Sequence, residues 1–395
     1  MTIAGIIAEY NPFHNGHAFL IREMRRLGAD RIAVVMSGNF VQRGEPAILS
    51  KWARTKQALS CGADLVLELP LPWAIAGAER FALGGVSLLT ALGADAIGFG
   101  SECGDLGRLD EARRALTSPR LHEALQSLLQ SGASFASVRQ QAVESLFGSE
   151  TALLLREPNN ILGIEYLKAI DTLGSDLKPY TVKRSRTLRL GEEAAGDMAA
   201  SAAIRAMMAK GNDFSRYVPE HSYRITEDEI AAGRAPADIA FLDRCVLADL
   251  RRMDREKLSR LPDISEGLEN RIYAAVRSAG SLSELLRSVK TKRYSAARIR
   301  RIILSAFLGV KASDSAGTPP YLRVLGIGKN GAEILKQAKQ KSRLSIISRY
   351  SEGNNLNGRA LEILELENRA ADLYALCMPH AEQCGLDRST KLIVI

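Results

Sequence analysis

Apolar and polar positions along the first 190 residues follow the pattern of short buried strands separated by amphipathic helices. Runs rich in Val, Ile or Leu begin about thirty residues apart, which is the length of a β-α-β unit. With one weaker run near residue 180, the predicted strands are residues 2–9, 31–36, 64–69, 94–99 and 179–183. Helical periodicity lies between them over residues 17–27, 50–61 and 77–92. Strands that are apolar on both faces and alternate with helices predict an α/β fold with a doubly wound parallel sheet.

The pattern changes to helices after about residue 190. An earlier helical stretch over residues 106–147 interrupts the strands, and the later helices are expected over residues 199–210, 226–253, 267–279, 281–289 and 296–308. A linker rich in Ser, Gly and Pro covers residues 312–320, after which strand, glycine turn, helix and strand return, with a last strand at 391–395. We therefore expect an α/β domain over residues 1–190, a helical domain over 191–311 and a small α/β region over 321–395.

Positive charge is concentrated in the helical part. The chain has 53 Lys and Arg against 45 Asp and Glu, a net charge of +8. Residues 271–311 hold ten basic residues and one acid, Glu284, so this stretch carries +9 and the rest of the chain −1. Such a field suits a polyanion, although a solvated helix face is the simpler explanation. The residues predicted to contact RNA phosphates are Lys290, Lys292, Arg293, Arg298, Arg300 and Arg301.

Other features limit the class of protein. No window has the roughly 18 uninterrupted apolar residues of a membrane span, and the N-terminus lacks the pattern of a secretory signal, so we expect a cytoplasmic protein. The five cysteines form no C-x-x-C pair and are expected to be thiols. No His, Cys and carboxylate cluster has zinc spacing, so we expect no metal bound by the protein itself.

The strongest chemical signal is the segment N-P-F-H-N-G-H, residues 11–17, where the first strand ends and the first helix begins. Two of the chain's five histidines, His14 and His17, flank Gly16 there. Free N–H groups and the dipole of a helix N-terminus favour phosphate, and a glycine allows close approach of the backbone. We predict that both imidazoles donate hydrogen bonds to a nucleotide triphosphate. The alternative is a helix cap beside an exposed histidine.

This turn resembles the H-x-G-H signature of the nucleotidyltransferase superfamily, whose fold is Rossmann-like. A longer series of blocks resembles the bacterial tRNA(Met) cytidine acetate ligase family from Gly5 to about Arg301: GIIAEYNPFHNGH, MSGNFVQRGEPA, GADLVLELP, NNILGIEYLKA, SEGLENRI and TKRYSAARIRR. The resemblance implies that acetate and ATP give acetyl-AMP and pyrophosphate. It also implies that N4 of the wobble cytidine in elongator tRNA(Met) is then acetylated.

The resemblance further implies a set of ATP contacts. They are Ile7, Ala8, Glu9, Tyr10, Asn11, Pro12, Phe13, His14, Asn15, Gly16, His17, Ala18, Phe19, Leu20, Gly100, Asn159 and Arg184, to which we add Asn160. At least one of the two asparagines is expected to cap the helix that follows. A lysine-bearing K-M-S-K-S signature is missing, so Arg184 is the expected second phosphate clamp. Mg²⁺ is expected to arrive with ATP through water and phosphate oxygens.

The loop after the second strand is the expected acyl or acceptor pocket, through Ser37, Gly38, Asn39, Gln42 and Arg43. A purely structural loop is the alternative. Two other functions fit the same residues. One is transfer of AMP to a small phosphorylated metabolite, with incidental basic helices. The other is a nucleotide-sensing RNA-binding protein without turnover.

Overall fold

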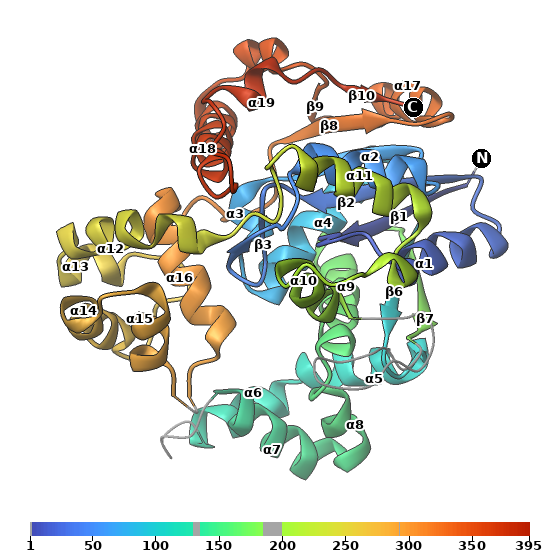
Figure 1. The fold of residues 1–395 in the computed structure, drawn as a ribbon. Coiled ribbons are helices and arrows are strands. Elements are labelled where there is room, and N and C mark those ends of the chain that lie inside the picture. Colours follow the sequence, from blue (N-terminus) through green and yellow to red (C-terminus); the bar gives the residue numbers. More distant parts are fainter. Residues whose placement is uncertain (1, 129–134, 185–199, 292) are drawn as a thin grey trace.

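The computed structural model describes residues 2–128, 135–184, 200–291 and 293–395. Its centre is an eight-stranded sheet with the order β10-β8-β5-β2-β1-β6-β7, in which β9 also pairs with β8 (Figure 1). The strands are β1 (Ile3–Ala8), β2 (Arg31–Ser37), β5 (Leu65–Leu69), β6 (Ala96–Ser101), β7 (Lys178–Lys183), β8 (Tyr321–Ile327), β9 (Ser345–Ile347) and β10 (Ile393–Val394). The five strands predicted in the first 190 residues are all present.

The order of the strands confirms a doubly wound parallel sheet. The chain starts in the middle with β1, adds β2 and β5 on one side, and then adds β6 and β7 on the other, all in parallel. The direction of winding therefore reverses between β1 and β6. In open α/β sheets the ligand crevice lies at this reversal, beyond the carboxyl ends of the strands.

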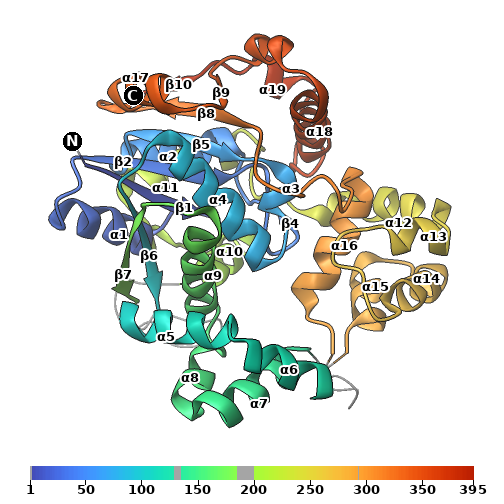
Figure 2. The ribbon, with the colours of Figure 1, turned by 180° about the vertical axis from the view of Figure 1, so that it is seen from behind.

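Both faces of the sheet are covered, which explains why its strands are apolar throughout. Along β1, Ile3 and Ile7 belong to the core beneath α4 (Ala78–Leu92) and α9 (Pro158–Leu173), whereas Ala4 and Ile6 belong to the core beneath α1 (Asn15–Arg26) and α2 (Lys51–Ser60). Figure 2 views the molecule from the side of α4 and α9. The period of two places alternate residues of each strand in different layers.

The helical excursion expected over residues 106–147 is present below the sheet in Figure 1. It consists of α5 (Leu106–Leu116), α6 (Pro119–Leu128), α7 (Phe135–Phe147) and α8 (Ser149–Leu154). The sequence pattern gave no indication of the short helix α3 (Leu71–Ala74) or of a small hairpin formed by β3 (Phe40–Val41) and β4 (Glu45–Pro46). None of the helices in the described parts of the chain is long and apolar enough to cross a membrane.

Helices dominate residues 200–308. They are α10 (Ser201–Ala209), η2 (Ser215–Tyr217), α11 (Glu220–Ala231), η3 (Ile239–Leu242), α12 (Asp243–Arg252), α13 (Arg255–Ser259), α14 (Leu268–Ser278), α15 (Leu282–Val289) and α16 (Ala296–Leu308). The single helix predicted over residues 226–253 is wrong, because the chain breaks at Gly233, which has a φ of 71°, and at Pro236. As a result α11 packs on α2, whereas α12 joins a separate core with α14, α15 and α16.

The C-terminal region extends the main sheet. Strand β8 lies antiparallel beside β5, with Leu65 opposite Ile327, and β9 and β10 pair with β8 in parallel. The strand, glycine turn, helix and strand predicted here correspond to β8, α17 (Gly331–Lys341) and β9. They are followed by η4 (Tyr350–Asn355), α18 (Gly358–Ala375) and α19 (Leu386–Ser389). Long-range pairing of β8 with β5 leaves no local signal in the sequence.

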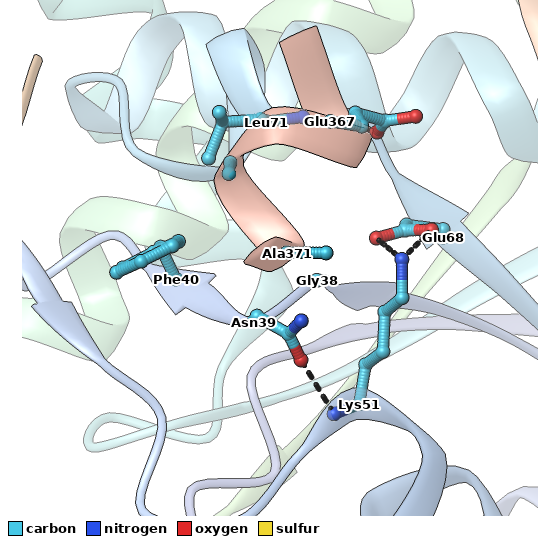
Figure 3. Close-up of a pocket in the computed structure, with 9 residues that line it drawn as sticks. Gly38, Asn39, Phe40, Lys51, Glu68, Leu71, Glu367 and Ala371 are labelled. Carbon is cyan, nitrogen blue, oxygen red and sulfur yellow. Dashed lines mark hydrogen bonds and ion pairs between the residues drawn. The ribbon is translucent and has the colours of Figure 1, made fainter. Parts of the chain in front are cut away.

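A buried cluster of charged side chains joins this region to the sheet, beside a cavity of about 10 Å³ (Figure 3). Lys51 Nζ lies 2.8 Å from Glu68 Oε1 and 2.7 Å from Asp387 Oδ1. The Nη1 of Arg323 lies 2.8 Å from Asp387 Oδ2 and 3.6 Å from Glu367 Oε2. Three carboxyl groups share two cations, so the cluster has a negative charge in excess only when all three are ionised. Burial and the neighbouring Glu68 raise the pKa of Glu367 to about 7, against the opposing effect of Arg323 and Lys51.

We predict that this carboxyl makes stability depend on pH. Because the pKa of Glu367 is higher in the folded than in the unfolded chain, its contribution is fully present below about pH 4.5 and is lost as the pH rises to about 7. The Glu367→Gln variant should therefore lose less free energy of unfolding than wild type between pH 5 and pH 7.5, measured by urea unfolding. The exposed Glu365→Gln on the same helix is the control. An equal loss in wild type and E367Q would contradict the prediction.

Candidate active site

His14 and His17 lie at the start of α1, directly beyond the end of β1. His14 precedes the helix, and its Nδ1 accepts a hydrogen bond from the backbone N–H of Gly16 at 3.1 Å. The Nδ1 of His17 accepts from the N–H of His14 at 3.2 Å. The rings stack with their centroids 3.7 Å apart and 18° between their planes. A histidine cap, the alternative interpretation, is thus present, but it occupies only one nitrogen of each ring.

The hydrogen bonds also assign the protonation of both rings. A neutral imidazole whose Nδ1 accepts carries its proton on Nε2. Burial, with the charge of Arg184 as a smaller cause, lowers the pKa of His14 to about 3. Burial, His14 and Arg184 hold the pKa of His17 well below its usual value. Both imidazoles are therefore neutral near pH 7, and each has one Nε2–H donor left.

Arg54 fixes the backbone from which this turn starts. Its side chain is fully buried and donates to four backbone carbonyls, those of Leu49 at 2.9 Å, Glu9 at 2.6 Å, Ser37 at 3.0 Å, and Gly38. The residue after Glu9, Tyr10, has a φ of 50°, a left-handed conformation that is unfavourable for a bulky side chain. The surrounding contacts thus hold a strained backbone at the start of the turn, as is common at functional sites.

Gly100 and Arg184 lie next to each other at the ends of β6 and β7. The N–H of Arg184 donates to the carbonyl of Ser101 at 2.9 Å, and a Cβ on Gly100 would lie 3.2 Å from Arg184 Cγ. The charge of Arg184 contributes to the lowered pKa values of both histidines. The structure thus brings together the two residues that the sequence placed at separate strand ends.

The expected cap by an asparagine is wrong. Helix α9 begins at Pro158, and the carboxylate of Glu102 accepts from the N–H groups of Asn159 and Asn160 at 3.3 and 2.8 Å. The Nδ2 of Asn159 also donates to Glu102, at 2.5 Å. The buried Oδ1 of Asn160 accepts from the N–H of Cys103 at 3.1 Å. A carboxylate supplied by the loop after β6 satisfies the helix N-terminus better than a neutral amide does.

The loop after β2 divides into a structural part and an exposed tip. The carbonyls of Ser37 and Gly38 accept hydrogen bonds from Arg54, and the Oδ1 of Asn39 accepts one from the N–H of Lys51 at 2.9 Å. Glu68 and Glu367 line the adjacent cavity beside Lys51 (Figure 3), so a carboxylate ligand would meet negative charge there once Glu367 is ionised. The tip of the β3–β4 hairpin, residues 42–44, lies near the H-x-G-H turn. The N–H of Gln42 donates to Oε1 of Glu9, just before that turn, at 3.0 Å.

Arg205 is a site residue that the sequence interpretation missed. From α10, its Nη1 donates to the carbonyl of Asn11 at 2.8 Å and its Nη2 lies 3.0 Å from Glu45 Oε1. Burial lowers the pKa values of Arg184 and Arg205, and exposed Arg43 at the hairpin tip is close enough to add to this effect. The available signal was that Arg205 is the one charged residue in the helix SAAIRAMMA.

The predicted RNA contacts are distributed unevenly. Lys290 and Arg293 are exposed, but Arg293 is paired with Glu266 at 2.8 Å, and Lys292 lies outside the described residues. Arg298 donates to Ser265 Oγ at 2.7 Å. The other two are bonded within the protein, Arg300 to the carbonyl of Arg43 at 3.0 Å and Arg301 to Asp263 at 2.8 Å. Two acids just before the counted stretch thus neutralise part of its charge.

Metal-binding side chains do not gather at this site. In the parts of the chain with described coordinates, no group of three His, Cys, Asp or Glu residues is arranged to hold an ion. All five cysteines are free thiols.

Fold and site together define a nucleotide-binding α/β protein of the H-x-G-H class, with its histidines at the reversal of strand order. Comparison with known proteins agrees. The model of the family described as HIGH Nucleotidyl Transferase matches residues 1–388. The tRNA(Met) cytidine acetate ligase of Acetivibrio thermocellus is 38% identical to this chain, over 100% of both sequences. That of Syntrophomonas wolfei is 39% identical, over 99% of both sequences.

Solved structures give the same result. The crystal structure of Thermotoga maritima TmcAL bound with alpha-thio ATP is 33% identical and superimposes with a TM-score of 0.92, covering both chains completely. The apo form has a TM-score of 0.94. This chain belongs to the HIGH nucleotidyl transferase family and, within it, to the tRNA(Met) cytidine acetate ligases.

Gly44 gives a test of the contact between the hairpin and α16. Its φ is 75°, and a Cβ there would lie 2.5 Å from the backbone nitrogen of Arg301. Gly309 has a φ of 74° and open space around its Cβ position, so Gly309→Ala measures the cost of the left-handed backbone alone. We expect Gly44→Ala to lower the free energy of unfolding by about 1–3 kcal/mol more than G309A, because the helix backbone cannot move away. Denaturant unfolding of both variants measures the difference, and equal losses would refute the steric contact.

Proposed function

We propose that this chain is an ATP-dependent tRNA(Met) cytidine acetate ligase that activates acetate as acetyl-AMP and acetylates N4 of the wobble cytidine of elongator tRNA(Met). The observation that carries the proposal is the pair of neutral imidazoles at the carboxyl end of β1, in a chain that matches ligases of this name along its length. Residues 1–190 bind ATP and acetate, residues 191–311 bind tRNA, and residues 321–395 complete the sheet.

In the first step an acetate oxygen attacks the α-phosphate and pyrophosphate leaves. Negative charge grows on the leaving oxygens, and the Nε2–H groups of His14 and His17 donate to them together with the N-terminus of α1. Donors that are already oriented need no reorganisation when the charge appears. Gly100 allows close approach of the nucleoside, and Asn159 contacts the nucleotide from the start of α9.

Arginines supply the positive charge, since both histidines are neutral. Arg184 is next to the imidazoles, and Arg43 and Arg205 lie beyond it on the hairpin and α10. Together they clamp the phosphates, a role that the lysine of the K-M-S-K-S signature, which this chain lacks, has in other members of the superfamily. Mg²⁺ is held mainly by triphosphate oxygens and water, where it neutralises phosphate charge.

Acyl transfer places different demands on the site. The N4 amine of cytidine is a weak nucleophile, so the enzyme must hold it against the acetyl group and exclude water from the mixed anhydride. Gln42 and Arg43 at the hairpin tip are the residues of the predicted acyl pocket that face the site, and Arg43 can bind the acetate oxygens.

The tRNA is bound along the exposed face of the helical body. Lys290 and Arg293 contact phosphates, with Lys292, Arg298, Arg300 and Arg301 completing the predicted surface. Such contacts provide affinity and dependence on salt, while the unstacked cytidine is recognised at its base edge.

One experiment separates this function from its rivals. Acetate-dependent exchange of label between ATP and pyrophosphate, followed by mass analysis of tRNA nucleosides, tests both steps. A protein that transfers AMP to a phosphorylated metabolite shows no exchange with acetate. A nucleotide sensor shows neither exchange nor N4-acetylcytidine.

We predict that His14→Ala and His17→Ala each raise the barrier by on the order of 3 kcal/mol, a loss of roughly 10²-fold in the exchange rate, because an oriented donor is removed. Exposed His221→Ala on α11 is the control and should keep the wild-type rate. Exchange at the wild-type rate in both site variants would exclude the assigned role.

A further inference from the structure

Glu9 belongs to the segment that the resemblance places against ATP, but its carboxylate cannot itself favour phosphate. It lies between the last residue of β1 and the H-x-G-H turn, and its negative charge opposes the approach of a triphosphate. The arginines and imidazoles described above all favour phosphate. Because the carboxylate of Glu9 disfavours the binding of ATP but is still held in a fixed position, we expect its role in the second step, acyl transfer.

The contacts of Glu9 determine its position closely. Its backbone carbonyl accepts from buried Arg54 at 2.6 Å, and the next residue, Tyr10, has the left-handed φ of 50°. Its Oε1 accepts from the N–H of Gln42 at 3.0 Å, which ties it to the tip of the hairpin. Among the residues that the structure describes, the other oxygen, Oε2, has no hydrogen-bond donor. The carboxylate is thus fixed at one oxygen and open at the other.

The charged and titratable groups around Glu9 come from four elements. Arg43 and Glu45 belong to the hairpin, Arg205 to α10, buried Arg54 to α2, and the hydroxyl of Tyr166 to α9. Burial is the largest influence and raises the pKa of Glu9 above its usual value, while Arg43 and Arg205 oppose it. A carboxylate of raised basicity beside an acceptor site matches what a general base requires.

We propose that Glu9 receives the proton of the acceptor amine during acyl transfer, through Oε2; this rests on the proposed ligase function. The carboxylate first accepts a hydrogen bond from the N4 amine, as acids do when they recognise cytosine. Nitrogen then attacks the carbonyl carbon of acetyl-AMP and a C–N bond forms. The bond from that carbon to the phosphate oxygen breaks, AMP leaves with the electron pair, and the amine proton passes to Oε2 and then to solvent.

The proposal also explains why the amine is distinguished from other nucleophiles. Uridine presents a carbonyl oxygen where cytidine presents N4, and that oxygen would be repelled by an ionised carboxylate. Water is not excluded by charge, so it must be kept out by closure of the site.

The test is Glu9→Gln, in which the amide oxygen can still accept from Gln42 but the side chain cannot take a proton. Acetate-dependent ATP–pyrophosphate exchange, with and without tRNA, measures activation, and single-turnover formation of N4-acetylcytidine measures transfer. We expect transfer slower by roughly 10²–10⁴-fold and a loss of exchange at least about tenfold smaller than that, since Glu9 also lies in the segment predicted to contact ATP. The loss of transfer rate toward low pH should disappear in E9Q, and Glu9→Asp should recover part of the rate. Exposed E365Q is the control.

Each other outcome overturns the proposal. Equal losses of exchange and transfer would make Glu9 part of the nucleotide or Mg²⁺ site. Unchanged transfer would place the proton acceptor elsewhere. A rise in the unfolding temperature of E9Q on addition of ATP is the check that this variant is folded and binds nucleotide. Wild-type protein that neither exchanges nor acetylates would remove the ligase function itself, a result distinct from failure of the Glu9 assignment.

Discussion

The hydrogen bonds of one buried guanidinium hold the site together. Arg54 has no exposed surface, and its donors are directed to backbone carbonyls that end β1, end β2 and precede α2. Carbonyls at the ends of parallel strands lack ladder partners and would otherwise need water. Burial lowers the pKa of Arg54 to about 10, which leaves it charged near neutral pH. Its charge strengthens each bond, so the strand ends that carry the H-x-G-H turn and the hairpin have one common anchor.

Neutral donors at the centre and charges at the edge follow from this packing. Rings stacked 3.7 Å apart cannot both be protonated without strong repulsion, and their burial favours the uncharged form. A phosphate at the proposed site would therefore meet directional N–H groups at the turn and, among the described residues, the full charges of Arg184, Arg43 and Arg205 around it. The arrangement keeps the geometry of the turn independent of pH over the physiological range.

The sequence predicted those features that local patterns encode. Apolar strands about thirty residues apart, the helices between them and the glycine turn after β1 predicted the sheet and the position of the histidines. The features it missed depend on residues far apart in the chain. Glu102 replaces an asparagine as the cap of α9, and Arg205 reaches the turn from α10. The buried charge of Lys51 is balanced by Asp387, with which it forms an ion pair, and by Glu367, both more than 300 residues away in the chain. Neither periodicity nor charge counting detects such pairs.

The basic helix α16 supports the hairpin as well as contributing to the surface proposed for tRNA, and the charge count did not separate the two. The Nε of Arg300 donates to the carbonyl of Arg43, Arg301 reaches toward Gln42, and Gly44 lies against the helix backbone. The same tip supplies the N–H that holds Glu9. If a phosphate bound to the remaining N–H groups of Arg300, it would therefore contact the same side chain that bonds to the hairpin. The hairpin thus connects the proposed acceptor side of the active site to the surface proposed for tRNA, because Arg300 bonds to Arg43 and Gln42 bonds to Glu9.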